Sequence, residues 1–433
     1  MNKFKIVLIL LGGFVVGMNQ LGCSDGGGGT SRKPSVYFPT NLTGDNVVPL
    51  SVGACGVHGY VNEPCISVTI CTPGTSQCQT IDNILVDTGS YGLKIFKSLI
   101  TVPLNQVPYA GDATRGLANC TRYLDGSGHW GQVVKADVKL GNIKTDSSIS
   151  IVTLDSSYSE KAKCASNPDS GPDVAGFNGI IGVGSFVEDC SVGFGTVGQN
   201  GCLAGSPATL PNKYWGCRSN PNDCIEVPVP AADQIVNPVA KLVSHNNGLV
   251  MMLPEVPLAG AGAAYGYLIL GIGTDENNSG TGLTVFAQDH DATFATEYNG
   301  NTYEYSFIDS GTNFNGFPQQ SGGYPALCSG DSGFYCPAAL INISATMKSG
   351  STTKVVSFEV GNMVTLASSE PYSMVYRNVA FDSSDLNGDP FDWGLPFFLG
   401  RSVYVGIYGK SAVINKTTLN PTGTTVSGPF WAF

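Results

Sequence analysis

The chain has 433 residues and a formal net charge of −11, yet only 13% of its residues are charged. Its 56 glycines and 25 prolines are typical of turn-rich β structure outside the cytoplasm. Basic residues do not cluster beyond the extreme N-terminus, which argues against a nucleic-acid partner. The sequence has no CxxC pair and its four histidines are scattered, so we expect neither a metal nor a cofactor.

Residues 1–22 form a predicted export signal. Two lysines precede an apolar core at 6–16, which is too short to span a bilayer. The signal ends before Cys23 and a glycine-rich tether, 23–34, and the pattern resembles a bacterial lipoprotein signal except at Gln20. This resemblance implies a lipid on Cys23, no other membrane contact, and a location in the bacterial cell envelope. An ordinary cleaved signal, followed by secretion, is the alternative.

Short apolar or alternating runs, separated by Gly, Asn, Asp and Pro, continue along the rest of the chain. Runs of this length and spacing predict an all-β fold. Only two short helical turns are expected, near 96–99 and 233–242. The clearest predicted strands lie at 66–70, 84–86, 133–140, 267–270, 303–308, 355–360 and 403–407.

The chain has 13 cysteines, an odd number that becomes even once Cys23 is set aside. An even number fits a set of disulfides formed in an oxidising compartment, with a pairing that the sequence leaves open. Four of the cysteines fall in residues 189–236, which we interpret as a Cys-rich insertion held by disulfides. This insertion separates a predicted N-terminal β lobe, 35–188, from a predicted C-terminal β lobe, 237–433.

Each predicted lobe contains an apolar strand that runs into an Asp-Thr/Ser-Gly-Ser/Thr motif. The first motif carries Asp87 and the second carries Asp309. Two carboxyls brought face to face share one proton, because both cannot ionise at close range. The ionised carboxyl then acts as general base on a water, while the protonated one polarises a carbonyl. Asp87 and Asp309 are therefore the predicted catalytic pair, and two unrelated β-turns are the alternative.

The other motif residues have supporting roles in this prediction. Hydroxyls at the second motif position reach across to the opposite loop, and hydroxyls at the fourth position bond to the carboxylates. Glycine lets the backbone bend sharply beneath each carboxylate. The supporting residues are Thr88, Gly89, Ser90, Ser310, Gly311 and Thr312.

A second element follows each motif at a similar distance. Apolar residues with glycine occur at 179–184 and 397–400, with Ile180 placed 93 residues after Asp87 and Phe398 placed 89 residues after Asp309. A matched offset predicts two lobes built on one plan, each of which contributes one aspartate to a shared cleft.

Together these motifs resemble the pepsin family of aspartic proteases, in which an apolar-apolar-Gly strand crosses beneath each catalytic loop. The hairpin at 123–140 resembles the family's flap, which implies that Tyr123 and Gly126 close over bound peptide. Residues 266–274 resemble the segment that opens the family's second lobe. The resemblance implies a bilobal all-β architecture with a central cleft and a peptide or protein substrate. We expect a monomer.

Three stretches, 86–93, 237–240 and 391–398, resemble the bacterial DUF3443 lipoprotein family. That resemblance implies export and a pepsin-like shape without an established activity. Two residues depart from the pepsin pattern. Tyr91 is a bulky residue that we expect to narrow the cleft, and Asn313 stands where a small residue is commoner.

The leading hypothesis is an exported, lipid-anchored aspartic endopeptidase that cleaves extended peptides. A catalytically silent, pepsin-shaped lipoprotein that binds peptides or proteins is the first alternative. A structural envelope protein whose aspartate loops only pack is the second. The proximity of the Asp87 and Asp309 side chains discriminates between catalysis and packing.

Overall fold

The computed structural model describes most of the chain. Strands account for 47% and helices for 7%, so the predicted all-β class is confirmed. The predicted signal, Cys23 and nearly all of the tether lie outside the described residues. The described residues are 33–56, 60–123, 126–158, 164, 169–190, 212–218, 223–289, 292–330, 333–370, 372–384, 386, 388–416 and 420–433.

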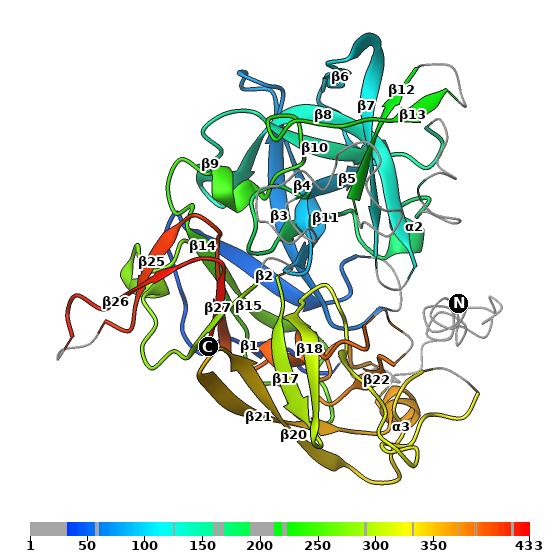
Figure 1. Cartoon of the computed structure of the whole chain (residues 1–433), viewed down its shortest axis with the longest axis vertical. Coiled ribbons are helices and arrows are strands. Elements are labelled where there is room, and N and C mark those ends of the chain that lie inside the picture. The colour runs from blue at the N-terminus through cyan, green and yellow to red at the C-terminus, as the bar shows by residue number, and fades with distance from the viewer. Residues whose placement is uncertain are drawn as a thin grey trace, which may run out of the picture.

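The N-terminal half forms the upper part of Figure 1, drawn blue to green. Its elements are β3 (Glu63–Cys71), β4 (Cys78–Asp87), β5 (Tyr91–Phe96), η1 (Lys97–Leu99), β6 (Pro108–Tyr109), β7 (Asp112–Arg122), β8 (Gly128–Leu140), β9 (Ile143–Lys144), β10 (Ile149–Leu154), α2 (Pro172–Ala175) and β11 (Gly179–Val183). The long strands pair antiparallel, β3 with β4, β7 with β8, and β8 with β10. The 3-10 helix η1 lies at the first predicted helical turn.

Strands from distant parts of the chain join the two halves. These elements are β1 (Val36–Tyr37), β2 (Val47–Gly53), η3 (Pro238–Lys241), β14 (Gly248–Met252), β15 (Ala264–Leu270), η4 (Glu276–Asn278), β16 (Val285–Ala287), β24 (Ser402–Gly406) and β27 (Phe430–Ala432). Strand β2 pairs with β3 on one side and with β15 on the other. Both halves therefore contribute to a single sheet of 18 strands among the described residues. The 3-10 helix η3 lies at the second predicted helical turn.

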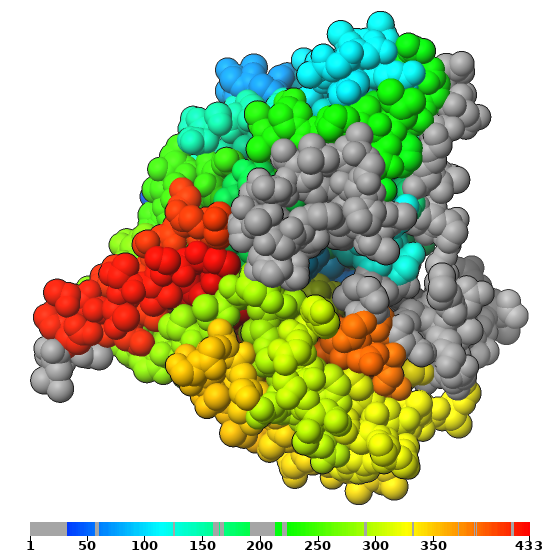
Figure 2. Space-filling view, viewed as in Figure 1, coloured from blue at the N-terminus to red at the C-terminus, as the bar shows by residue number. Residues whose placement is uncertain are grey.

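The C-terminal half adds a second sheet, in the lower part of Figure 1. The remaining elements are β17 (Phe294–Tyr298), β18 (Asn301–Ile308), β19 (Asn315–Phe317), β20 (Ile341–Ser349), β21 (Thr352–Val360), α3 (Met363–Ser369), β22 (Ala380–Asp382), β23 (Asp392–Trp393), α4 (Leu395–Phe398), β25 (Ser411–Ile414) and β26 (Thr424–Ser427). The strand order in this sheet is β21-β20-β17-β18-β23-β19-β22. Strands β25 and β26 form a hairpin that projects from one side of the molecule (Figure 2).

The strands that lead to the two aspartate motifs share one apolar core. Ile84 and Val86 of β4 are completely buried, and Ile308 of β18 is 1% exposed. Burial of a side chain of this size contributes about 1.5–3 kcal/mol relative to exposure. Each motif loop therefore starts from a strand end that tight packing holds in place.

Five disulfides lie within the described residues, which fits the oxidising compartment that the cysteine count indicates. Cys71–Cys78 links β3 to β4. The other four are Cys55–Cys65, Cys120–Cys164, Cys217–Cys224 and Cys328–Cys336. Within the described part of the chain, no helix has the length and apolar character needed to cross a membrane.

The predicted insertion, 189–236, is described only in part. Residues 191–211 and 219–222 lie outside the described ranges. The described part contains β12 (Asn212–Cys217) and β13 (Cys224–Glu226), which pair antiparallel, and β12 also pairs along β7. This part of the segment therefore extends the N-terminal half of the sheet.

Candidate active site

Strands β4 and β18 lead to the two predicted aspartates, and the loops that follow are tied together by reciprocal hydrogen bonds. The Thr88 N–H donates to Ser310 Oγ over 3.1 Å, and the Ser310 N–H donates to Thr88 Oγ1 over 2.9 Å. Each hydroxyl then donates to a carbonyl on the opposite strand, Thr88 to Ile308 over 3.1 Å and Ser310 to Val86 over 2.7 Å. The pattern has the symmetry of two equivalent loops that face each other.

These four bonds are made in a dry environment. Thr88 is 3% exposed and Ser310 is completely buried. A typical hydrogen bond contributes about 1 kcal/mol, and leaving a buried partner unsatisfied costs about 1–3 kcal/mol. The two loops are therefore fixed relative to each other, although 222 residues separate them in the sequence.

The carboxyl of Asp87 receives two hydrogen bonds from its own loop. The Gly89 N–H donates to Asp87 Oδ1 over 2.7 Å, and the Ser90 hydroxyl donates to Oδ2. Asp87 is 4% exposed, whereas Gly89 above it is exposed. These donors fix the orientation of the carboxyl within its loop.

The carboxyl of Asp309 has the same environment in the second loop. The Gly311 N–H donates to Asp309 Oδ1 over 2.7 Å, and the Thr312 hydroxyl donates to Oδ2 over 3.2 Å. Asp309, Gly311 and Thr312 are all partly exposed. The structure thus brings all eight motif residues together, at a place that solvent reaches.

The two glycines show how close the carboxyls are. A Cβ on Gly89 would lie 2.5 Å from Cγ and Oδ2 of Asp309, and a Cβ on Gly311 would lie 2.9 Å from Cγ of Asp87. Neither glycine has a left-handed φ. Gly89 lies in a bend and Gly311 in a turn, which fits the expected sharp change of backbone direction, and the close approach of the opposite carboxyl is a second reason for glycine at both positions.

The carboxyls of Asp87 and Asp309, here called the carboxyl pair, lie close together and interact directly. Burial raises the pKa of Asp309 well above its ordinary value, and the charges of Asp87 and Asp392 raise it further. Two carboxyls at this distance hold one proton between them, because ionising both places like charges in contact. One member is then a base and the other an acid.

A strand beneath each loop completes its support. In the first half, β11 runs parallel to β4 with Gly182 opposite Asp87. In the second half, β23 runs parallel to β18 with Trp393 opposite Ile308, and the Asp309 N–H donates to the Trp393 carbonyl over 3.0 Å. The two loops therefore rest on equivalent strands.

The sequence-based assignment of the second supporting strand is wrong. Residues 397–400 do not form a strand, because Phe397 and Phe398 end the short helix α4. The supporting strand is Asp392–Trp393, followed by Gly394. A search for two apolar residues before glycine passes over this strand, because its first residue is an acid. Asp392 is a residue of the site that the sequence analysis missed. Its only signal in the sequence is its position just before a Trp-Gly pair.

The predicted flap hairpin joins β7 to β8. Its turn is closed by bonds from the Tyr123 N–H to the Ser127 carbonyl and from the Gly126 N–H to the Tyr123 carbonyl, both 3.0 Å. Gly126 has φ +83°, a left-handed conformation that favours glycine. Residues 124–125 lie outside the described residues.

The Tyr123 side chain contacts a histidine rather than pointing freely into solvent. Its hydroxyl is 2.8 Å from His129 Nδ1, and His129 Nε2 is 3.1 Å from Asp169 Oδ2. The tyrosine also packs against the apolar cluster that contains Leu85 and Ile180. Closure of Tyr123 over bound peptide stays a prediction.

The two departures from the pepsin pattern have structural roles. Tyr91 is 6% exposed and packs edge-on against Phe186, with ring centroids 6.1 Å apart. It is buried below the loop, so the expectation that it narrows the cleft is wrong. Asn313 joins the halves, because its side chain donates to the Val61 carbonyl while the Asn62 side chain donates to the Asn313 carbonyl.

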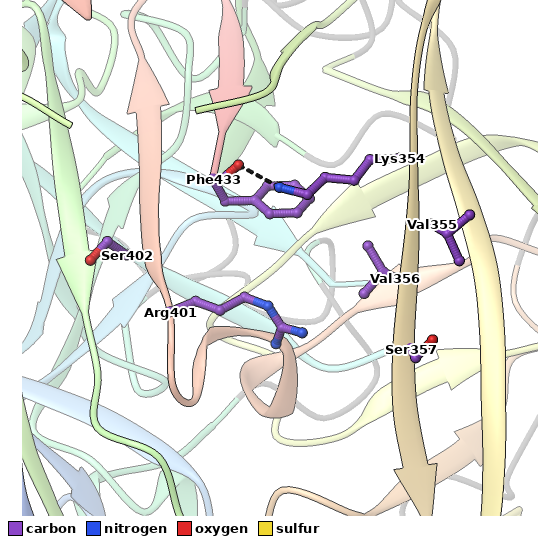
Figure 3. A pocket seen from close by; sticks show the side chains of 7 residues that line it. All are labelled: Lys354, Val355, Val356, Ser357, Arg401, Ser402 and Phe433. Carbon is purple, nitrogen blue, oxygen red and sulfur yellow. Dashed lines mark hydrogen bonds between the residues drawn. The ribbon is translucent and has the colours of Figure 1, made fainter. Parts of the chain in front are cut away.

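A cavity of about 250 Å³ lies elsewhere, between β21, β24 and the C-terminal residue (Figure 3). Lys354 Nζ lies over the ring of Phe433 and donates to its main-chain oxygen over 2.8 Å. Neither member of the carboxyl pair lines this cavity. Among the described residues, no group of three or more His, Cys, Asp or Glu side chains is arranged to hold a metal ion.

Comparison with known families gives a match over residues 43–433, to a family described as "Protein of unknown function (DUF3443)". The match contains both aspartate loops, the strands beneath them and the hairpin. No curated protein matches the chain.

Proposed function

The chain belongs to the DUF3443 family, and we propose that it is an aspartic endopeptidase with a two-lobed, pepsin-like architecture. The observation that carries the proposal is the carboxyl pair. The carboxyls of Asp87 and Asp309 lie close together and interact directly, and reciprocal Thr88–Ser310 bonds lock their loops together. A protein in which these loops only pack has no need for two acids in direct contact, one of them buried, because such a contact is costly unless the pair shares a proton.

The chemistry is hydrolysis of a peptide bond by an activated water. The ionised carboxyl removes a proton from water, whose oxygen bonds to the carbonyl carbon of the substrate. The protonated carboxyl donates to the carbonyl oxygen, so that the tetrahedral intermediate is neutral. The C–N bond then breaks as the proton taken from water passes to the leaving amine, while a hydroxyl of the intermediate returns its proton to the other carboxylate, so that the pair again holds one proton. No cofactor takes part in this scheme.

The substrate proposed is an extended segment of a peptide or unfolded protein. Such a segment is held by main-chain hydrogen bonds along the cleft between the two lobes, with the β7–β8 hairpin as flap. The disulfides favour an oxidising, extracytoplasmic location. A lipid on Cys23 would tether a monomer to the bacterial cell envelope through the glycine-rich segment.

The test is cleavage of denatured casein from acidic to neutral pH, with and without pepstatin. We expect cleavage in acid, inhibition by pepstatin, and loss of activity in Asp87→Ala and in Asp309→Ala. Asp82→Ala is a matched control, because Asp82 is an exposed acid on the same strand as Asp87. Peptide binding without turnover in the wild-type protein would contradict the proposal and favour a silent binding lipoprotein.

A further inference from the structure

The third carboxyl at the site, Asp392, lies where the first half of the molecule has an apolar residue. On β11, Ile180 pairs with Leu85, two residues before Asp87. On β23, Asp392 pairs with Phe307, two residues before Asp309. Asp392 is therefore the counterpart of Ile180, so an acid replaces an aliphatic side chain at one of two equivalent positions.

The surroundings of Asp392 do not suit a charge. The residue is 3% exposed, and its Oδ1 has no hydrogen-bond partner. The charged groups that face it are acids, Asp309 on its own side and Asp87 across the pair, and no described cation offsets them. An ionised carboxylate in such a place is costly, because burial removes water and nothing replaces it. Burial raises the pKa of Asp392 well above its ordinary value; the Thr312 hydroxyl lowers this pKa in part, and the charge of Asp87 raises it.

Hydrogen atoms can be counted along the chain of contacts from Asp392 to Asp309. The Thr312 hydroxyl donates over 3.2 Å to Asp309 Oδ2, and it is also a neighbour that influences the pKa of the Asp392 carboxyl. A threonine hydroxyl has one hydrogen to donate. If it donates to Asp309, a bond to Asp392 needs a hydrogen from Asp392, which a protonated carboxyl supplies.

We propose that Asp392 is a positioning residue of the carboxyl pair: in its protonated form it donates to Thr312 Oγ1, so that the Thr312 hydroxyl hydrogen points at Asp309 Oδ2. Asp392 touches neither water nor substrate in this arrangement and acts through Thr312. The catalytic consequence rests on the proposed peptidase function, whereas the protonation of Asp392 does not. In the first half, Ser90 bonds to Asp87 and no third carboxyl stands behind it.

The first experiment measures protonation without any assay of activity. The folded protein keeps the Asp392 proton, while the unfolded chain loses it near pH 4, so folding takes up a proton above that pH. The contribution of Asp392 to the stability of the wild-type protein therefore falls as the pH rises from about 4. Asparagine does not ionise, so Asp392→Asn removes that loss. We expect the Tm of Asp392→Asn minus that of the wild type to be near zero at pH 4 and to reach about 2–4 °C at pH 7.

A matched control is Glu304→Gln, because Glu304 is an exposed acid on β18. Its Tm difference from the wild type should not rise with pH. For Asp392→Asn, a Tm difference that is flat or that falls with pH shows an ordinary or ionised carboxyl, and either result overturns the proposal.

The second experiment compares kcat and KM for casein-derived peptides in Asp392→Asn, Asp392→Ile and Thr312→Ala. Asparagine still donates to Thr312, whereas isoleucine copies the first half and does not. We expect kcat to fall about tenfold in Asp392→Ile, with KM unchanged within about twofold, and to fall several-fold less in Asp392→Asn.

The double variant Thr312→Ala/Asp392→Ile should lose no more than either single variant, because both act through one hydrogen bond. Independent, multiplicative losses would overturn the positioning role. If the wild-type protein does not cleave peptides, the proposed function fails, and the Tm series still decides whether Asp392 is protonated.

Discussion

The two aspartate loops have matching hydrogen bonds, but a basic side chain lies beneath one loop and an acidic side chain lies beneath the other. Where the first half pairs Ile180 with Lys94, the second half pairs Asp392 with Gly316. Lys94 is 1% exposed and donates to the Tyr91 carbonyl. The first loop thus has a buried base beneath it, and the second loop has a buried acid.

This difference acts on the carboxyl pair. Burial lowers the pKa of Lys94, while its interactions with Asp189 and Asp87 raise it. An acid beside Asp309 favours the protonated form. A symmetric frame therefore holds two chemically identical groups in different surroundings, and in the proposed peptidase we assign Asp309 the role of the acid and Asp87 that of the base.

The largest expected effect comes from adding one methyl group at the point where the loops touch. In Gly89→Ala the new Cβ meets the Asp309 carboxyl at 2.5 Å, so we expect casein cleavage to fall at least about a hundredfold. Gly311→Ala, with a 2.9 Å approach to Asp87, should lose less. Equal activity in both variants, measured against the wild type, would break the comparison between the loops.

The next largest effect is expected from removing the two hydroxyls that bond the loops to each other. Thr88→Ala and Ser310→Ala each remove two buried hydrogen bonds, and we expect each to lower the free energy of unfolding by about 2–3 kcal/mol in urea. The conservative exchanges Thr88→Ser and Ser310→Thr keep the hydroxyl and should lose much less. A loss confined to one loop would show that the symmetric bonding is unequal in energy.

Removing hydrogen bonds between the two halves should have a smaller effect on the free energy of unfolding. Asn313→Ala removes one hydrogen bond to the Val61 carbonyl, and we expect a loss of about 1 kcal/mol in the free energy of unfolding. Asn62→Ala removes bonds to the carbonyls of Asn313 and Tyr376 and should lose more. Both variants should unfold in a single urea transition, and a second transition would mean that the halves unfold separately.

The smallest expected effect concerns two buried acids that lie away from the carboxyl pair. Burial raises the pKa of Glu63 to about 8, against a lowering by the bond from the Cys55 N–H, and burial raises that of Asp189 to about 7. Both acids are protonated in the folded protein above the pH at which the unfolded chain ionises. Stability should therefore fall as the pH rises from about 4 to 8.

Glu63→Gln should flatten that decline in a Tm series without changing the pH profile of casein cleavage, because Glu63 bonds to Cys55 N–H rather than to the carboxyl pair. A shifted activity profile would show that acids outside the loops also control the pair.

The sequence predicts the β class, the disulfide-forming cysteines and both aspartate motifs from local patterns. Strand 84–86 and strand 303–308 lie within β4 and β18. The prediction failed at 397–400, because an apolar run before glycine forms a strand or a short helix equally well. It also misjudged Tyr91, since the neighbour that buries this ring, Phe186, is far along the chain.

The sequence by itself therefore determined which residues are proposed to carry the chemistry, since Asp-Thr-Gly-Ser and Asp-Ser-Gly-Thr after apolar strands can be recognised without a structure. Only the tertiary structure decided that Asp87 and Asp309 meet and that Asp392 stands behind one of them. The physical reason is that contact between loops 222 residues apart depends on strand register and side-chain burial, which are set by the packing of the whole chain.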